Sequence, residues 1–163
     1  MAAGLVSCTS EADQKAKLGA ANMAFYTRVF DVAVNEGRTD IFDSAYVDDA
    51  VLHTVPEVKG KVNAKAYYMN YVTGFSERQF IVKEMFADGD KLVKYWEFKG
   101  KHTGDFFGIP ASGNYLDLSG TTIVTMRDGK IAKEHDFFNM QTILDQLTKS
   151  KGDLVIDKQK SIN

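Results

Sequence analysis

Two Asp-Gly turns, each set between long runs of alternating apolar and polar residues, constrain the fold of this chain most. The turn "DGD" separates the runs at residues 78–87 and 91–102, and the turn "DG" separates the runs at residues 115–127 and 130–138. A type I′ turn needs positive φ at both central positions, which Asp-Gly supplies, so the pattern predicts two β-hairpins. Strands this long must twist and coil, which predicts a strongly curved sheet.

The N-terminal half of the chain is predominantly helical in pattern. Apolar residues recur there at helical spacing, and Gly37 and Pro56 are typical of element ends. The predicted elements outside the hairpins are helices at residues 11–36, 39–45, 62–75 and 141–149 and a short strand at residues 50–55.

Helices that mostly precede a run of strands predict an α+β fold, with an antiparallel sheet covered on one face by helices. A strongly curved sheet capped in this way forms a cone-shaped barrel around a single apolar pocket. With 163 residues, the chain is long enough for one domain. We place that domain at residues 11–150, between an N-terminal segment at residues 1–10 and a polar tail at residues 151–163.

Composition excludes several classes of function. The net charge is −2 and no basic block is present, which argues against nucleic-acid binding. No apolar run is long enough for a membrane span. The chain has a single cysteine and no Cys/His set with zinc spacing, so we expect no metal site.

The single cysteine, Cys8, permits two interpretations. The stretch "LVSC" resembles the lipobox of bacterial lipoproteins, and the polar "TSEADQK" after it resembles a tether. Only four residues precede Leu5, so a charged n-region and most of an apolar h-region are missing. Lipidation of Cys8 would place the domain at the bacterial cell envelope as its only membrane contact. The alternative is a disordered N-terminus with a free thiol on a cytoplasmic protein.

One long loop and the strand after it resemble a known family. The stretch "HTGDFFGIPASG" followed by "SGTTIVTMRDGKI" resembles the SnoaL-like polyketide cyclase and ester cyclase family, part of the nuclear transport factor 2-like superfamily with a cystatin-like fold. The likeness extends over roughly residues 18–147, and Ala111 replaces the second proline of the family loop. It implies a cone-shaped α+β barrel, an activity of cyclase, isomerase, dehydratase or hydrolase type, and no metal or organic cofactor.

The resemblance implies a catalytic role for Asp136. In characterised cyclases of the family, an Asp on the last strand is the general acid/base of an aldol closure, and Asp136 matches that position. The chain departs from the family at His135, where Trp is usual, and at Asn139, where Asp is frequent. A desolvated carboxylate gains basicity, which suits this role. The alternative is an exposed or ion-paired Asp near the strand end.

Strand parity separates the neighbours of Asp136. Glu134 shares its face, so the two carboxyl groups could interact in a ligand-binding pocket, or Glu134 could be solvated and paired with a surface lysine. His135 faces the other way. Because this strand is apolar on both faces, we expect one face to line a cavity and the other to meet a second subunit in a homodimer.

Two histidines and several aromatic residues complete the predicted site. His102 or His53 could polarise a substrate carbonyl, or His102 could anchor the loop that follows it and His53 could be a core histidine. Because a lid would lie at the Phe106-Phe107 pair, those two are the stronger lining candidates. Any of the aromatic residues could instead be plain core. The candidate ligand-contacting aromatic residues are Trp96, Tyr67, Tyr71, Phe106 and Phe107.

Two functions follow from these observations. The first is a cofactor-independent cyclase, isomerase or hydratase that acts on a small hydrophobic carbonyl compound through Asp136. The second is a non-catalytic carrier of a small hydrophobic molecule, which lipidation of Cys8 would favour.

Overall fold

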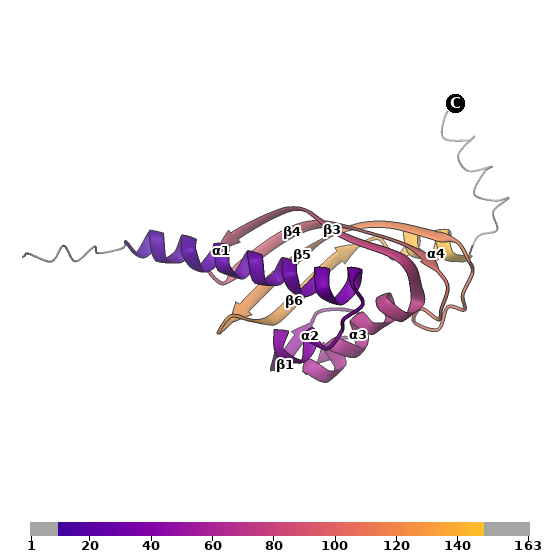
Figure 1. Ribbon diagram of the computed structural model, residues 1–163, viewed down its shortest axis with the longest axis horizontal. Helices are drawn as coiled ribbons and strands as arrows, with labels where there is room; N and C mark the ends of the chain where they lie inside the picture. The colour runs from indigo at the N-terminus through magenta and orange to yellow at the C-terminus, as the bar shows by residue number, and fades with distance from the viewer. Residues whose placement is uncertain (1–9, 149–163) are drawn as a thin grey trace, which may run out of the picture.

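The computed structural model describes residues 10–148 as an α+β fold in which helices cover one face of a curled sheet (Figure 1). The predicted fold class is therefore confirmed. The predictions for Cys8 and for residues 151–163 lie outside the described residues. Within residues 10–148, no helix combines the length and the apolar character needed to cross a membrane.

In the described part of the chain, the sheet has six strands in the order β2-β1-β6-β5-β4-β3. Strands β3 to β6 form the long curved part, and β1 and β2 extend it at one edge. The strands are β1 (Tyr46–Leu52), β2 (Val58–Lys59), β3 (Phe75–Asp88), β4 (Lys91–His102), β5 (Tyr115–Arg127) and β6 (Lys130–Phe138).

Both predicted hairpins are present, with different turns. Asp128 and Gly129 both have positive φ, as a type I′ turn requires. In the first hairpin Asp88 pairs with Lys91, so the turn is Gly89-Asp90 rather than Asp88-Gly89. Of these two, Gly89 alone has positive φ, the pattern of a type II′ turn.

The sheet departs from a purely antiparallel barrel in two ways. Strand β1 begins at Tyr46 rather than at residue 50 and pairs in parallel with β6, with Leu52 opposite Glu134. The edge strands β2 and β3 do not pair with each other, so the sheet curls without closing. The two-residue strand β2 was not predicted, because it is too short to show a pattern.

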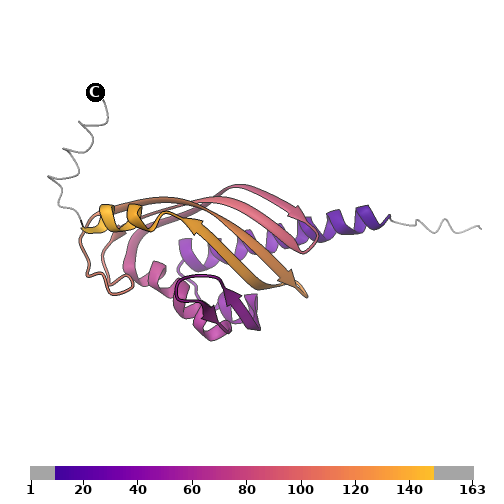
Figure 2. The ribbon, with the colours of Figure 1, turned by 180° about the vertical axis from the view of Figure 1, so that it is seen from behind.

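Within residues 10–148, four α-helices and one π-helical segment pack around the sheet. Helix α1 lies along the sheet and extends beyond it, and α4 lies at the opposite end, as the view from behind shows (Figure 2). Helix α1 packs on β3, and α3 packs on β1. The helices are α1 (Glu11–Phe30), the π-helix η1 (Asp31–Asn35), α2 (Ile41–Ala45), α3 (Lys61–Gly74) and α4 (Met140–Thr148).

Helix α1 begins at a capping box and packs against the rest of the protein through its second half. Ser10 and Asp13 form a capping box, in which each side chain accepts from the backbone N–H of the other. Its buried apolar residues, including Tyr26, Val29 and Phe30, lie in the second half of the helix. The predicted single helix to residue 36 is wrong in detail, since α-helical geometry gives way to a π-helix at Asp31. That half of α1 covers one side of a small cavity.

Candidate functional site

A small cavity lies between the sheet and the N-terminal helices. Its volume is about 30 Å³, enough for a water molecule but not for an organic ligand. Phe80 and Phe138 on its wall are half-buried, so they lie where the cavity meets the surface. The lining residues are Phe30, Val34, Tyr68, Tyr71, Phe80, Lys94, Trp96, Phe98, Asp136 and Phe138.

Asp136 is the carboxylate of this cavity. The Thr122 hydroxyl donates a hydrogen bond of 2.5 Å to Asp136 Oδ1 and accepts one of 2.9 Å from Trp96 Nε1. This chain of hydrogen bonds fixes the carboxylate on the wall. Burial raises the pKa of Asp136 above its ordinary value, and the Lys94 charge and the Thr122 hydrogen bond oppose that rise. His135, on the opposite face of β6, is exposed.

The indole of Trp96 lies against the backbone of Gly120 on the neighbouring strand. A Cβ atom on Gly120 would come within 2.5 Å of Trp96 Cζ2, which no side chain can tolerate without movement. Gly120 therefore leaves the space in which the indole reaches Thr122.

Glu134 is fully buried, and its carboxylate is surrounded by tyrosines rather than by solvent. Its Oε2 atom accepts hydrogen bonds from Tyr46 at 2.5 Å and from Tyr68 at 3.0 Å, and its Oε1 atom accepts a short one from Tyr26. The expectation of a solvated Glu134 paired with a surface lysine is wrong.

Burial is the main cause of the shifted pKa values around Glu134. It raises the pKa of the Glu134 carboxyl, and the charge of the nearby Asp136 raises it further. It raises the pKa of all three tyrosines well above their ordinary value, so their hydroxyls stay protonated and donate. Although Glu134 shares the face of Asp136, it is not among the cavity-lining residues, and its oxygens are occupied within the protein.

Lys94 is a second ionisable group in the cavity, and we did not predict it. Its side chain is only 2% exposed, and Nζ lies 4.4 Å from the ring centroids of Tyr26 and Phe30 and 4.7 Å from that of Phe80. Burial lowers its pKa to about 8, although the charges of Glu134 and Asp136 act in the opposite direction. Strand parity carried the signal, because Lys94 shares a face with the apolar Leu92, Trp96 and Phe98.

His102 lies at the end of β4, where it holds the following loop. It is fully buried, its Nδ1 lies 3.0 Å from Ser112 Oγ, and it accepts a hydrogen bond of 3.2 Å from the Ser112 N–H. Its ring packs against Phe75 and Phe106. Burial lowers the pKa of His102, which favours the neutral ring. His102 does not line the cavity, and its contacts are those of a loop anchor.

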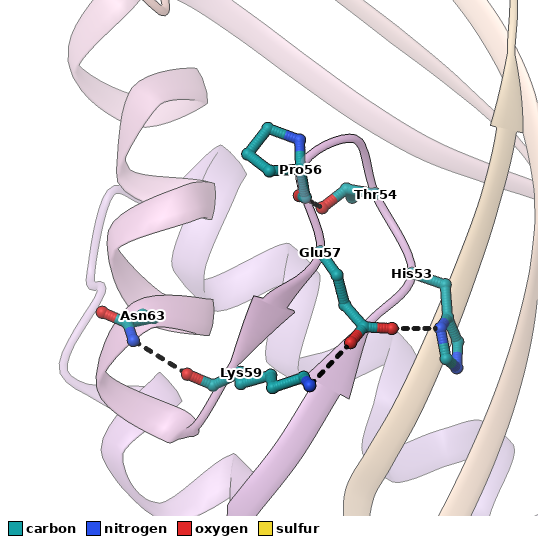
Figure 3. Close-up of polar contacts among 6 residues, drawn as sticks. All are labelled: His53, Thr54, Pro56, Glu57, Lys59 and Asn63. Atoms are coloured by element: carbon teal, nitrogen blue, oxygen red, sulfur yellow. Dashed lines mark hydrogen bonds and ion pairs between the residues drawn. The ribbon is translucent and has the colours of Figure 1, made fainter.

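His53 lies on the outside of the molecule, away from the cavity. Its Nδ1 atom is 2.9 Å from a Glu57 oxygen, and Glu57 also pairs with Lys59 (Figure 3). Its ring centroid is 5.3 Å from that of the exposed His135. His53 is therefore neither placed to polarise a carbonyl in the cavity nor a core histidine, because β1 ends at Leu52 and the next residue turns out to the surface.

The five predicted aromatic contacts divide into two groups. Trp96 and Tyr71 line the cavity. Phe106 is buried against Tyr71, with ring centroids 5.0 Å apart, and the more exposed Phe107 packs on Tyr67 at 5.2 Å. These three residues outside the lining form an aromatic layer behind it.

A family model described as SnoaL-like polyketide cyclase matches residues 23–147, which include every residue of this cavity. The chain belongs to the SnoaL-like polyketide cyclase family. The predicted family is thereby confirmed, and with it a family of cyclase and isomerase type. None of the curated proteins compared with the chain matches it.

Solved structures agree with this SnoaL-like fold. A protein named as a SnoaL-like polyketide cyclase from Jannaschia sp. CCS1 is 22% identical, with a TM-score of 0.74 over 82% of this chain and 95% of that chain. TsrD from Streptomyces laurentii is 22% identical, with a TM-score of 0.71 over 79% of this chain and 96% of that one. An LEH-like epoxide hydrolase from M. tuberculosis is 16% identical, with a TM-score of 0.63 over 85% and 98%. At these identities the likeness concerns the fold alone.

Residues 10–148 of this SnoaL-like chain contain no group of three His, Cys, Asp or Glu side chains placed to hold a metal ion. Its polar chemistry at the cavity comes from Asp136, Lys94 and tyrosine hydroxyls.

Proposed function

We propose that this SnoaL-like protein catalyses proton transfer beside the carbonyl group of a small hydrophobic compound, as a cofactor-independent cyclase or isomerase with Asp136 as general acid/base. The observation that carries this function is the position of Asp136. Its carboxylate faces an aromatic cavity, is held by Thr122, and has a raised pKa that makes it a stronger base.

The reaction needs a base and a place for the reacting carbon. The Asp136 carboxylate takes a proton from the carbon next to the carbonyl, and the electron pair of that C–H bond moves to form an enolate. In an isomerase, Asp136 returns the proton at another carbon. In a cyclase, the enolate carbon attacks a second carbonyl of the same molecule, and the resulting alkoxide takes the proton back from Asp136. His102 and His53 lie away from the cavity, so neither is assigned a contact with the substrate.

Substrate entry requires the cavity to widen. The present volume of about 30 Å³ is far below that of an organic ligand. Phe80, Asp136 and Phe138 are the half-buried wall residues, so the cavity meets the surface beside Asp136, and rotation of the two Phe side chains would widen it there. A lining this aromatic favours compounds with one or two carbonyl groups on a flat apolar frame.

Hydrogen–deuterium exchange tests the proposal with simple ketones in place of the natural substrate. Small aromatic and aliphatic ketones are incubated with the protein in D₂O, and loss of the α-proton signal is followed by NMR. We expect Asp136→Asn to abolish exchange while thermal-shift binding of the same compound survives. The matched control is Asp117→Asn, which changes an exposed Asp on β5. Unchanged exchange in the Asp136→Asn variant would refute the assignment.

A second candidate function is carriage of a small hydrophobic molecule without chemistry. It is favoured by the small number of polar groups in the cavity, since Glu134 lies outside the lining with its oxygens bound by tyrosines, and neither predicted histidine lines the cavity. The same screen distinguishes the two functions, since a carrier shows thermal shifts with no exchange in any compound that binds.

We also propose that the outer face of the sheet forms a homodimer contact. Val93 pairs with Ile123 and Phe137 with Thr121, which places exposed apolar side chains side by side on three strands. Such a patch, used twice about a two-fold axis, suits an isologous interface. Light scattering after size exclusion should show a dimer that Ile123→Lys converts to a monomer. Leu144→Lys, the same change at an exposed position on α4, should leave the dimer intact, and a monomeric wild type would exclude the contact.

A further inference from the structure

The amine of Lys94 is in an unusual place for a lysine. Nζ lies over the faces of Tyr26, Phe30 and Phe80, with Trp96 at 5.9 Å, and the residue lines the same cavity as Asp136. None of the ion pairs among residues 10–148 involves Lys94. A buried ammonium without a directly paired carboxylate is costly, so this amine loses its proton easily.

The lowered pKa of Lys94 makes its amine a nucleophile at mildly alkaline pH. Because this pKa is about 8, about half of the Lys94 side chains are neutral amines at pH 8. A surface lysine with a pKa of about 10.4 is neutral in well under one per cent of molecules, so Lys94 presents roughly 100-fold more free amine. Lysines desolvated in apolar pockets are activated for imine formation in this way.

We propose that Lys94 is a covalent attachment point that binds aldehydes and ketones in the cavity as imines. This inference rests on the proposed function for its substrate class, a carbonyl compound. The Nζ lone pair attacks the carbonyl carbon and forms a C–N bond, while the C=O π pair moves to oxygen, which takes a proton. The carbinolamine then loses its hydroxyl as water with the second nitrogen proton, which leaves a C=N bond. Overall, one amine and one carbonyl give one imine and one water.

The surroundings of Lys94 suit the protonated imine as well as the ammonium. Both are cations, and the ring faces of Tyr26 and Phe30 stabilise either one. A protonated imine also acidifies the neighbouring C–H bond. Asp136 takes that proton, the C–H pair forms a C=C bond, and the C=N pair moves to nitrogen to give a neutral enamine. Lys94 and Asp136 would thus share one proton-transfer reaction.

The probe for this site is acetylacetone, a small diketone that condenses with neutral amines to a stable vinylogous amide with near-ultraviolet absorbance. Wild-type protein at about pH 8 should gain one molecule of acetylacetone less one water, mapped by peptide mass spectrometry to Lys94. Lys94→Arg and Lys94→Met should lose the adduct and its absorbance, and circular dichroism shows whether each variant is folded. The matched control Lys91→Arg changes an exposed lysine on the same strand and should react like the wild type. Equal labelling of surface lysines and Lys94, or an adduct retained in a folded Lys94→Arg variant, would overturn the proposal.

The failure of this inference can be separated from failure of the proposed function. Asp136→Asn should keep the Lys94 adduct while losing deuterium exchange. If Lys94 forms the adduct but no ketone exchanges its α-proton for deuterium, the imine site is supported and the catalytic role of Asp136 is excluded. Exchange that depends on Asp136 but proceeds at the wild-type rate in Lys94→Arg supports the general base and shows that the imine takes no part in the exchange reaction.

Discussion

The Tyr46 hydroxyl donates a hydrogen bond of 2.5 Å to the Glu134 carboxylate, which joins residues 88 positions apart in sequence. Tyr26 and Tyr68 donate to the same carboxylate, so α1, β1 and α3 are all tied to β6 at one buried charge. Removing a donor from a buried carboxylate leaves its charge less compensated, which is costly in a low-dielectric interior. Glu134 is therefore a structural centre of the fold beside the cavity rather than part of its lining.

Tyr46→Phe tests this role of Glu134. The variant loses one of three hydrogen bonds to a buried carboxylate, so we expect the free energy of unfolding to fall by about 1–3 kcal/mol. Urea unfolding followed by circular dichroism measures the change. The matched control is Tyr115→Phe, since Tyr115 also donates to a glutamate, Glu77, but is exposed. Its effect should stay within about 0.5 kcal/mol. Equal losses in both variants would show that burial of Glu134 adds nothing.

The lowered pKa of Lys94 predicts a pH-dependent stability. Its pKa is about 8 in the folded protein against an ordinary value of 10.5, so the folded state favours loss of the proton. The resulting stabilisation is present above the ordinary pKa and is lost as the pH falls through about 8. From about pH 8 to about pH 10, wild-type stability should rise relative to Lys94→Met by on the order of 2 kcal/mol.

Urea unfolding at several pH values in this range measures the difference. Tyr26, one of the two rings that lie 4.4 Å from the amine, has a pKa well above its ordinary value and stays protonated throughout. Lys91→Met, an exposed replacement on the same strand, should follow the wild type. A Lys94→Met curve parallel to that of the wild type would mean that the Lys94 amine titrates as it does in water.

Thr122→Val tests the positioning of Asp136. The variant removes the donor to Asp136 and leaves the Trp96 N–H without its acceptor, so we expect stability to fall by about 1–3 kcal/mol. Misplacement of a general base lowers turnover by about 100-fold. Because the Thr122 hydrogen bond lowers the pKa of Asp136, its loss should also shift the pH profile of deuterium exchange to higher pH. Thr122→Ser keeps the hydroxyl and should restore most of the rate. A profile that does not move in Thr122→Val would make Thr122 a packing residue only.

His102→Ala distinguishes a loop anchor from a catalytic residue. Without the contacts to Ser112, backbone hydrogen exchange measured by mass spectrometry should accelerate across residues 104–114, and stability should fall by about 1–3 kcal/mol. The pH profile of ketone exchange should keep the shape set by Asp136. Ser112→Ala removes only the hydroxyl contact and should have a smaller effect in the same direction. Loss of turnover in His102→Ala with unchanged loop exchange would restore a catalytic role for His102.

Local rules predicted much of this structure from sequence. Asp-Gly pairs placed both hairpins, and strand parity on β6 set Asp136 and His135 on opposite faces, as the structure has them. The loop motif identified the family. The errors lie where residues distant in sequence meet. The parallel pairing of β1 with β6 and the three tyrosines around Glu134 depend on contacts between elements, for which a single sequence carries no pattern.

Lys94 was missed for a different reason. A lysine within an alternating strand normally faces solvent, so its charge conflicts with the strand parity that places Lys94 on the face of Leu92 and Trp96. Four aromatic rings from three elements stabilise the buried amine. Because these elements are distant in sequence, no local pattern predicts that the rings meet at Lys94. His53 shows the reverse error, because it was expected inside the protein but follows the last residue of β1 and lies on the surface.

The contact between Gly120 and Trp96 bears on how such a chain can evolve. An added methyl group on Gly120 would collide with the indole, while a smaller residue at position 96 would enlarge the cavity on the same side. Neither change alters Asp136 or Lys94 themselves. Single substitutions at these two positions could therefore change the shape of the cavity in descendants of this protein, although a change at Trp96 would also remove the donor to Thr122.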